Sequence, residues 1–181
     1  MQQARYSIVA MALHWLILVL VIANWWIADS AEGLPQPQRL DIMLNHMALG
    51  IVILLVVLLR LAWRFTHTHP PLAATLKPWE RVFAKTVHIV FYVLLIGMPL
   101  AGWLASSFAG QGVNVFGVFT LPKLPVAKDL DMTKAIFEAH ATAGTILLIL
   151  IAIHALGSLK HTFIDKDGNL FRMLPWGMPK A

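Results

Sequence analysis

The sequence from Ala139 to His161 reads AHATAGTILLILIAIHALGSLKH. Up to Leu159 it contains no Asp, Glu, Lys or Arg, and most of its residues are Ile, Leu or Ala. About 20 such residues in a helix cross the roughly 30 Å hydrocarbon layer of a membrane. Two histidines, His140 and His154, lie inside this stretch, although an imidazole in hydrocarbon costs free energy unless a partner satisfies it. The stretch therefore predicts a transmembrane helix whose two histidines each bind a partner inside the membrane.

Three further stretches lack charged residues in the same way. They are Ile8–Ala28, Ile42–Leu59 and Thr86–Ala109. Because lipid offers no water to backbone groups, each spanning segment must be a helix. We expect an all-α integral membrane four-helix bundle that forms a single domain over residues 1–181. With their less apolar ends included, the helices are predicted at about 8–28, 42–64, 80–109 and 134–161.

The composition excludes several other classes of protein. Hydrophobic residues make up 59% of the 181 residues and charged residues only 13%, too few for the surface of a soluble domain. The absence of cysteine excludes disulfides, Cys-based zinc or iron–sulfur sites and thioether-linked haem. No cleavable signal peptide is expected, since the first apolar stretch is too long and no small-residue cleavage site follows it.

The distribution of basic residues predicts the orientation in the membrane. The N-terminus, the second connection and the C-terminal tail carry Arg5, Arg60, Arg64, Lys77, Arg81, Lys85, Lys160, Lys166, Arg172 and Lys180. The opposite side carries only Arg39, Lys123, Lys128 and Lys134. Basic residues concentrate on the cytoplasmic side of membrane proteins, so both termini are expected in the cytoplasm. Because topology explains the net charge of +5, no nucleic-acid partner is expected.

Five of the eight histidines fall inside the predicted spans, at two depths. His140 and His154 are almost four whole turns apart, so they share a helix face at a separation of ~21 Å. In alternating antiparallel helices, His14 comes to the depth of His154 near the cytoplasm. His46 comes to the depth of His140 near the outside.

Paired imidazoles from different helices are the ligands of a six-coordinate haem iron. The pattern therefore predicts two non-covalent haem b groups in the bundle core. Gly50 and Gly144 each follow an outer candidate ligand by one turn and leave room for a flat macrocycle. With both axial positions filled, outer-sphere electron transfer is favoured over oxygen binding. A proton-relay protein without haem would normally add intramembrane acids, and these spans contain none.

The remaining histidines have other expected roles. His88 lies near the cytoplasmic end of the third helix, where it could replace His14 or His154 as a ligand. Contact with a haem propionate or a second substrate is the preferred interpretation of His88. His67 and His69 are expected to be solvated loop residues rather than metal ligands.

Several motifs, in this order along the chain, resemble a known family. They are Ala12-Leu13-His14-Trp15, His46-Met47-Ala48-Leu49-Gly50, Arg60-Leu61-Ala62-Trp63-Arg64 followed by Pro70-Pro71, His88 with Pro99 and Gly102, and His140 with His154 followed by 159–167. Together they resemble the bacterial cytochrome b561 proteins, which are related to the diheme cytochrome b subunits of nickel hydrogenases and formate dehydrogenases. The resemblance implies a multi-pass protein of the bacterial inner membrane. It also implies haem ligation by His14 with His154 and by His46 with His140.

The resemblance further implies quinone chemistry, with ubiquinone or another quinone as acceptor near the cytoplasmic haem. Some family members oxidise superoxide at the periplasmic face, and others accept electrons from a partner enzyme. We therefore expect electron transfer between a periplasmic donor, either superoxide or a redox protein, and membrane quinone. An oxidoreductase of the superoxide:ubiquinone type is the leading hypothesis. The alternative is a membrane-anchor subunit that accepts electrons from a partner dehydrogenase or hydrogenase.

Candidate residues for the two substrates lie near the ends of the spans. His161 is two turns beyond His154 on the same face, where it could hydrogen-bond a quinone carbonyl or relay a proton. Ser158 and His88 are further quinone-site candidates. Lys128 and Lys134 are candidates for drawing an anionic donor toward the outer haem, although three acids in the same connection balance its three lysines.

Overall fold

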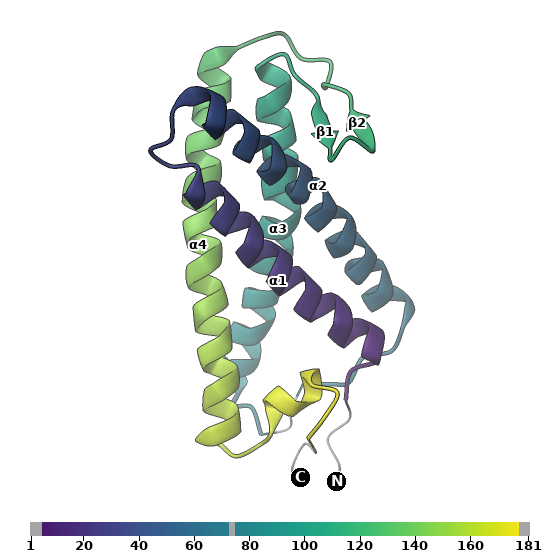
Figure 1. Cartoon of the computed structure of the whole chain (residues 1–181). Coiled ribbons are helices and arrows are strands. Elements are labelled where there is room, and N and C mark those ends of the chain that lie inside the picture. Colours follow the sequence, from purple (N-terminus) through teal and green to yellow (C-terminus); the bar gives the residue numbers. More distant parts are fainter. Residues whose placement is uncertain (1–4, 73–74, 178–181) are drawn as a thin grey trace.

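The protein is a bundle of four long helices, seen here in a computed structural model that describes residues 5–72 and 75–177 (Figure 1). The elements are α1 (Ile8–Ser30), α2 (Gln36–Thr66), α3 (Pro78–Phe108), β1 (Val113–Val115), β2 (Phe119–Leu121), α4 (Leu130–Phe163) and the 3-10 helix η1 (Asn169–Met173). All four α-helices are long and apolar enough to cross a membrane. The predicted four-helix membrane bundle is confirmed.

Two of the helices begin well before their charge-free segments. At the start of α4, Asp129 accepts a hydrogen bond from the Met132 backbone N–H at 2.9 Å, so the helix begins before the predicted residue 134. Pro37 lies in the first turn of α2, where a missing N–H costs nothing, and that helix begins before the predicted residue 42. The first turns of α2 and α4 are polar, and both extend the helices at the same end of the bundle.

The helices form two antiparallel pairs. α1 packs against α2, α3 packs against α4, and the two pairs meet through α2 and α3. In Figure 1 the α1–α2 pair crosses in front of the more upright α3–α4 pair. Within the described residues, close backbone packing between α1 and α4 is sparse. The space between α1 and α4 is therefore bridged by side chains, and the candidate histidines are among them.

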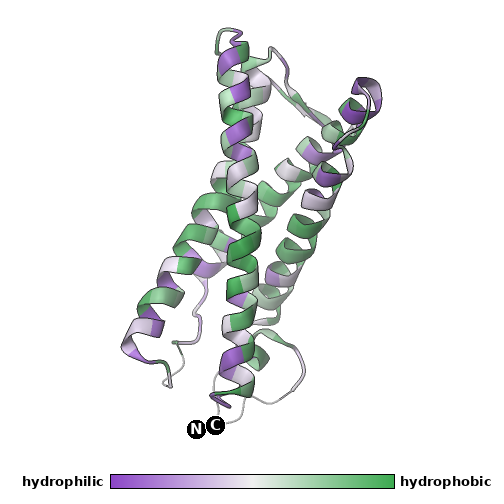
Figure 2. Ribbon diagram, turned by 90° about the vertical axis from the view of Figure 1, so that its left-hand side faces the viewer, coloured by the Kyte–Doolittle hydropathy of each residue, from purple (hydrophilic) through white to green (hydrophobic). Residues whose placement is uncertain are grey.

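An apolar layer lies at mid-height of the bundle. Ile17 and Val21 from α1 meet Ile53 and Val57 from α2 and Leu147 from α4. Figure 2 shows the same pattern, with apolar residues concentrated in the middle of the helices and polar ones near the ends. This layer falls between the two depths at which the histidines lie, and it keeps water out of the centre.

Two short strands, which were not predicted, follow α3. β1 and β2 pair antiparallel, with Val113 opposite Leu121. The connecting turn places Phe116 and Gly117 at positive φ, and the Asn114 side-chain oxygen accepts the Gly117 N–H at 2.7 Å. Val113 is buried against α2. The β-hairpin therefore folds back along α2 on the side of the bundle opposite the termini.

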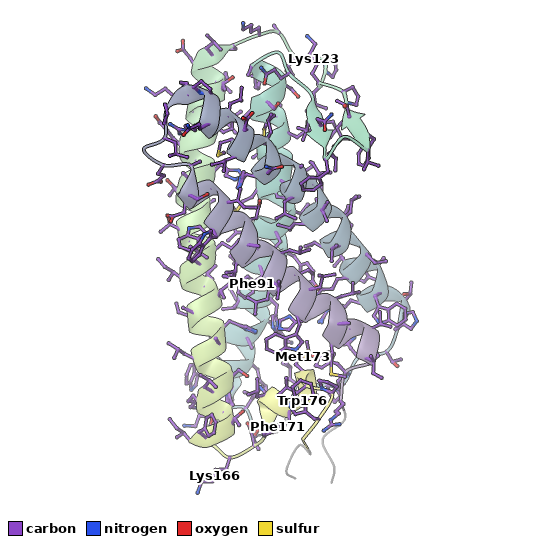
Figure 3. The ribbon with its side chains drawn as sticks, in the orientation of Figure 1. Phe91, Lys123, Lys166, Phe171, Met173 and Trp176 are labelled. Carbon is purple, nitrogen blue, oxygen red and sulfur yellow. The ribbon has the colours of Figure 1, made fainter. Side chains whose placement is uncertain are left out.

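The C-terminal segment closes the other end of the bundle. η1 packs against α4, and the Trp15 indole N–H of α1 donates to the Met173 carbonyl at 2.7 Å. The Tyr6 N–H donates to the Arg172 carbonyl at 3.2 Å. Figure 3 shows Phe171, Met173 and Trp176 gathered beneath α1. These bonds tie the start of α1 to the segment that follows α4.

Candidate functional site

Three histidines from three helices meet at the end of the bundle near Tyr6 and Met173; we call them the lower cluster. The rings of His14 on α1 and His154 on α4 have centres 6.1 Å apart, with an interplanar angle of 69°. His88 on α3 lies 5.6 Å from His154, ring centre to ring centre. The Phe91 ring packs edge-on against His154 at 5.5 Å. Both His14 and His88 therefore remain possible partners of His154.

Two histidines from two helices meet at the opposite end; we call them the upper pair. The ring centres of His46 on α2 and His140 on α4 are 6.0 Å apart, at 76°. His46 Nδ1 donates a hydrogen bond to the Asn24 backbone carbonyl at 3.0 Å. A carbonyl can only accept, so Nδ1 carries the hydrogen and Nε2 keeps a free lone pair. Asn24 thus orients His46 as a metal ligand requires.

The separations within both pairs suit a shared metal ion. A metal–imidazole bond is about 2 Å long and the ring centre lies about 1 Å behind the bonded nitrogen, so imidazoles on opposite sides of one ion have centres roughly 6 Å apart. The His14–His154 and His46–His140 distances both match this value. The residues present therefore fit an iron with two axial histidines.

Glycines lie beside the upper pair. A Cβ added to Gly102 on α3 would lie 3.7 Å from His140 Cε1, so the His140 ring approaches the α3 backbone there. Gly50 faces the Asn24 side chain and Gly144 faces Met98. The proposed role of Gly50 and Gly144, to leave room for a macrocycle, stays a prediction. The position of Gly102 beside His140 was not predicted, because contacts between helices cannot be read from spacing along one helix.

A charged network surrounds His161 just beyond the lower cluster. His161 Nδ1 lies 2.8 Å from Asp165 Oδ2 and 3.1 Å from Asp167 Oδ2. Asp167 is buried, and its Oδ2 also accepts a hydrogen bond from the Thr75 hydroxyl at 2.9 Å. Lys160 Nζ lies 2.6 Å from Asp165 Oδ2. Neither aspartate was predicted as a site residue, although Asp165 follows His161 by one helical turn.

This network is an ion-pair cluster rather than a divalent-metal site. Glu80, His161 and Asp165 do bring ligand atoms within 4.8 Å of one another. However, the Lys160 ammonium already lies between Glu80, at 2.7 Å, and Asp165. A second cation there would be repelled at short range. Glu80 and Lys160 thus join the start of α3 to the end of α4.

The remaining predicted site residues lie apart from these clusters or at their edges. Ser158 is half-buried on α4, between His154 and His161. At the other end of the bundle, Lys134 is exposed and lies 3.9 Å from Glu138, and Lys128 lies beside Gly110. Lys123 is on the same side (Figure 3). Because Glu138 offsets the charge of Lys134, the predicted donor entrance stays a prediction.

Comparison with known proteins decides the family. The profile described as prokaryotic cytochrome b561 matches residues 5–176, which contain both histidine groups. The chain belongs to the prokaryotic cytochrome b561 family. The resemblance found in the motifs is thereby confirmed. This cytochrome b561 family member is a membrane b-type cytochrome in electron transfer, which implies that it binds b-type haem.

Relatives of the cytochrome b561 family match over nearly their whole length. Cytochrome b561 homolog 2 of Escherichia coli K12 is 28% identical over 94% of this chain and 91% of its own. A probable superoxide oxidase CybB of Yersinia pestis is also 28% identical, over 94% of this chain and 96% of its own. Cytochrome b561 homolog 1 of E. coli K12 is 25% identical, over 94% and 97%. One of these names states a reaction, and the other two state only the family.

Proposed function

We propose that this protein carries electrons across the bacterial inner membrane from a periplasmic donor to a quinone, with both termini in the cytoplasm. Two haem b groups would be held by His14 with His154 and by His46 with His140. The observation that carries the proposal is the arrangement of these four residues. They form two pairs, each joining different helices at a ring separation near 6 Å, and α4 contributes to both. The haems supply one-electron chemistry when bound.

The protein's own residues set the conditions for that chemistry. The Asn24 carbonyl fixes the tautomer of His46, and the apolar layer around Val57 and Leu147 excludes water between the two pairs. His14 with His154 and His46 with His140 would each supply both protein ligands of a haem iron, and the haem would supply one-electron chemistry there. This arrangement favours electron transfer over ligand binding at iron.

Superoxide is the donor that we propose. The name of the Yersinia pestis relative supports this choice. In the balanced reaction, two superoxide ions lose one electron each and become dioxygen, while one quinone gains two electrons and two protons and becomes quinol. Lys128 and Lys134 would attract the anion toward the haem of His46 and His140.

Quinone reduction is assigned to the surroundings of His161. Asp165 and Asp167 both accept at Nδ1, so the imidazole keeps Nε2 for a quinone carbonyl or for proton delivery. Ser158 lies on the same face of α4, one turn before His161. The cytoplasmic position of His161 in the proposed topology lets protons come from the cytoplasm.

The function is tested by the purified chain alone in quinone-containing nanodiscs. When superoxide is generated enzymatically, we expect quinol to form at one molecule per two superoxide ions consumed. Superoxide dismutase, which removes the donor, should abolish the reaction. If the haems are present but superoxide reduces no quinone, superoxide oxidation is rejected. If the haems were then reduced only by a partner dehydrogenase or hydrogenase, the chain would be assigned as a membrane-anchor subunit.

Replacing His161 by glutamine should slow quinone reduction while both haems remain. We expect a loss of at least about tenfold in kcat, because proton transfer by a positioned side chain contributes about 10²–10⁴-fold. Asp167→Asn should cause a smaller loss and alter the pH profile, since it removes a carboxylate that fixes the His161 ring. Lys166→Gln is the control, because Lys166 points away from the bundle (Figure 3). A normal quinone rate in His161→Gln rejects the assignment.

A further inference from the structure

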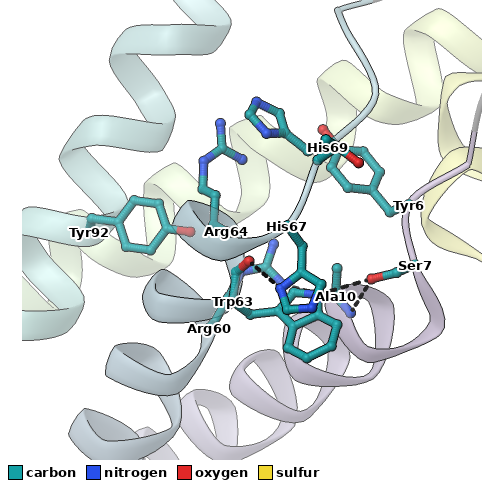
Figure 4. A pocket seen from close by; sticks show the side chains of 10 residues that line it. Tyr6, Ser7, Ala10, Arg60, Trp63, Arg64, His67, His69 and Tyr92 are labelled. Atoms are coloured by element: carbon teal, nitrogen blue, oxygen red, sulfur yellow. Dashed lines mark hydrogen bonds between the residues drawn. The ribbon is translucent and has the colours of Figure 1, made fainter.

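A basic pocket lies between the start of α1, the end of α2 and the middle of α3 (Figure 4). Its cavity volume is about 30 Å³, and the pocket is open on one side. Arg60 and Arg64 lie one turn apart on α2 and line it together with Tyr6, His69 and Tyr92. Among the described residues, none that lines the pocket is acidic. We call it the arginine pocket.

The arginine pocket adjoins the lower cluster. Arg60 Nη1 donates to the Ala10 carbonyl at 2.7 Å, and Ala10 is one turn before His14 on α1. On α3, Tyr92 is one turn beyond His88. The pocket is therefore a side chamber of the site where a haem is proposed.

The two guanidinium groups lack an anionic partner. Among residues 5–72 and 75–177, neither Arg60 nor Arg64 forms an ion pair with a carboxylate. Both are half-buried next to membrane-spanning segments. Removing a charged side chain from water costs free energy that an opposite charge repays. The pocket thus has the electrostatics of an anion site.

We propose that Arg60 and Arg64 bind the propionate carboxylates of the haem held by His14 and His154. The inference rests on the proposed function, which places that haem beside the pocket. A planar guanidinium offers paired donors that match a carboxylate, and haem b carries two of these groups. His88 is then free to pack against His154 without serving as the propionate contact.

The midpoint potentials of the two haems test this assignment in the purified holoprotein. Arg60→Gln and Arg64→Gln should each lower the potential of the cytoplasmic-side haem only, because a nearby positive charge favours the reduced iron. Arg64→Lys keeps the positive charge, so its cytoplasmic-side haem should have a midpoint potential close to that of the wild type. Arg39→Gln, near the opposite end of α2, is the matched control and should move neither potential. Unchanged potentials in both glutamine variants would overturn the proposal.

Haem exchange tests whether Arg64 contacts the propionate carboxylates or only supports the fold. After extraction, the wild type should bind haem more tightly than haem dimethyl ester at the cytoplasmic-side site. Arg64→Gln should weaken haem binding and leave ester binding unchanged. An equal loss for both compounds would show that the arginine acts on the fold and would overturn the proposal.

A lipid phosphate is the other source of a matching anion. The wild type is therefore measured in nanodiscs of phosphatidylcholine with and without phosphatidylglycerol. We expect the same cytoplasmic-side potential in both. A shift caused by phosphatidylglycerol and lost in Arg64→Gln would assign the pocket to lipid instead. A preparation without this haem would refute the proposed function, whereas two haems with unmoved potentials would refute only the propionate site.

Discussion

We expect His46→Leu and His140→Leu each to remove one haem from the protein, and the same haem in both variants. The two rings come from different helices but are 6.0 Å apart, as two ligands of one iron must be. Leucine fills similar space without a lone pair, so the iron loses an axial ligand. The haem content per chain, measured as the pyridine haemochrome, should fall from about two to about one.

Redox difference spectra identify which haem is lost. The His46→Leu and His140→Leu spectra should coincide, and the remaining haem should keep its wild-type midpoint potential. His161→Gln serves as the control that changes an imidazole and retains both haems. If the His46 and His140 variants lost different haems, or if either lost neither, the proposed pairing at this end of the bundle would be wrong.

His154→Leu should remove the other haem, because His154 is the residue that the lower cluster shares. Its ring is near both His14, at 6.1 Å, and His88, at 5.6 Å. We expect His14→Leu to have the same effect, since the proposed ligands are His14 and His154. His88→Leu should retain both haems. Haem content and the spectrum of the remaining haem are the measurements.

Comparison of the His14 and His88 variants decides between the two possible partners of His154. Retention of the cytoplasmic-side haem in His14→Leu, together with its loss in His88→Leu, would make His88 the ligand. The arrangement of the rings alone allows both choices. The single-residue substitutions separate them because an iron accepts only two axial ligands from the protein.

Much of the fold could be predicted because a membrane imposes a simple rule. Charge-free stretches such as Ile42–Leu59 must be helices, and alternating helices return to the same depth. The meeting of His14 with His154 and of His46 with His140 follows from that depth argument. The structure places these residues together from helices that lie far apart in the sequence.

The parts that were not predicted depend on contacts between elements. Arg60 and Arg64 were read only as evidence of topology, since nothing in their spacing shows that α1 and α3 close a pocket around them. Asp167 was missed because it reaches His161 only after the chain turns back beyond α4. The β-hairpin was missed because three-residue strands are too short to show a clear alternating pattern.

The sparse backbone packing between α1 and α4 in the described residues has a consequence for biogenesis. Within the described residues, the two helix pairs pack most closely through α2 and α3, and α4 reaches α1 and α2 through side chains such as Leu147. A bound haem would add contacts between α1 and α4. It would therefore stabilise the bundle in addition to carrying electrons. Cells starved of haem should therefore accumulate less of this protein, because chains that lack the contacts of the haem are less stable and become substrates for membrane proteases.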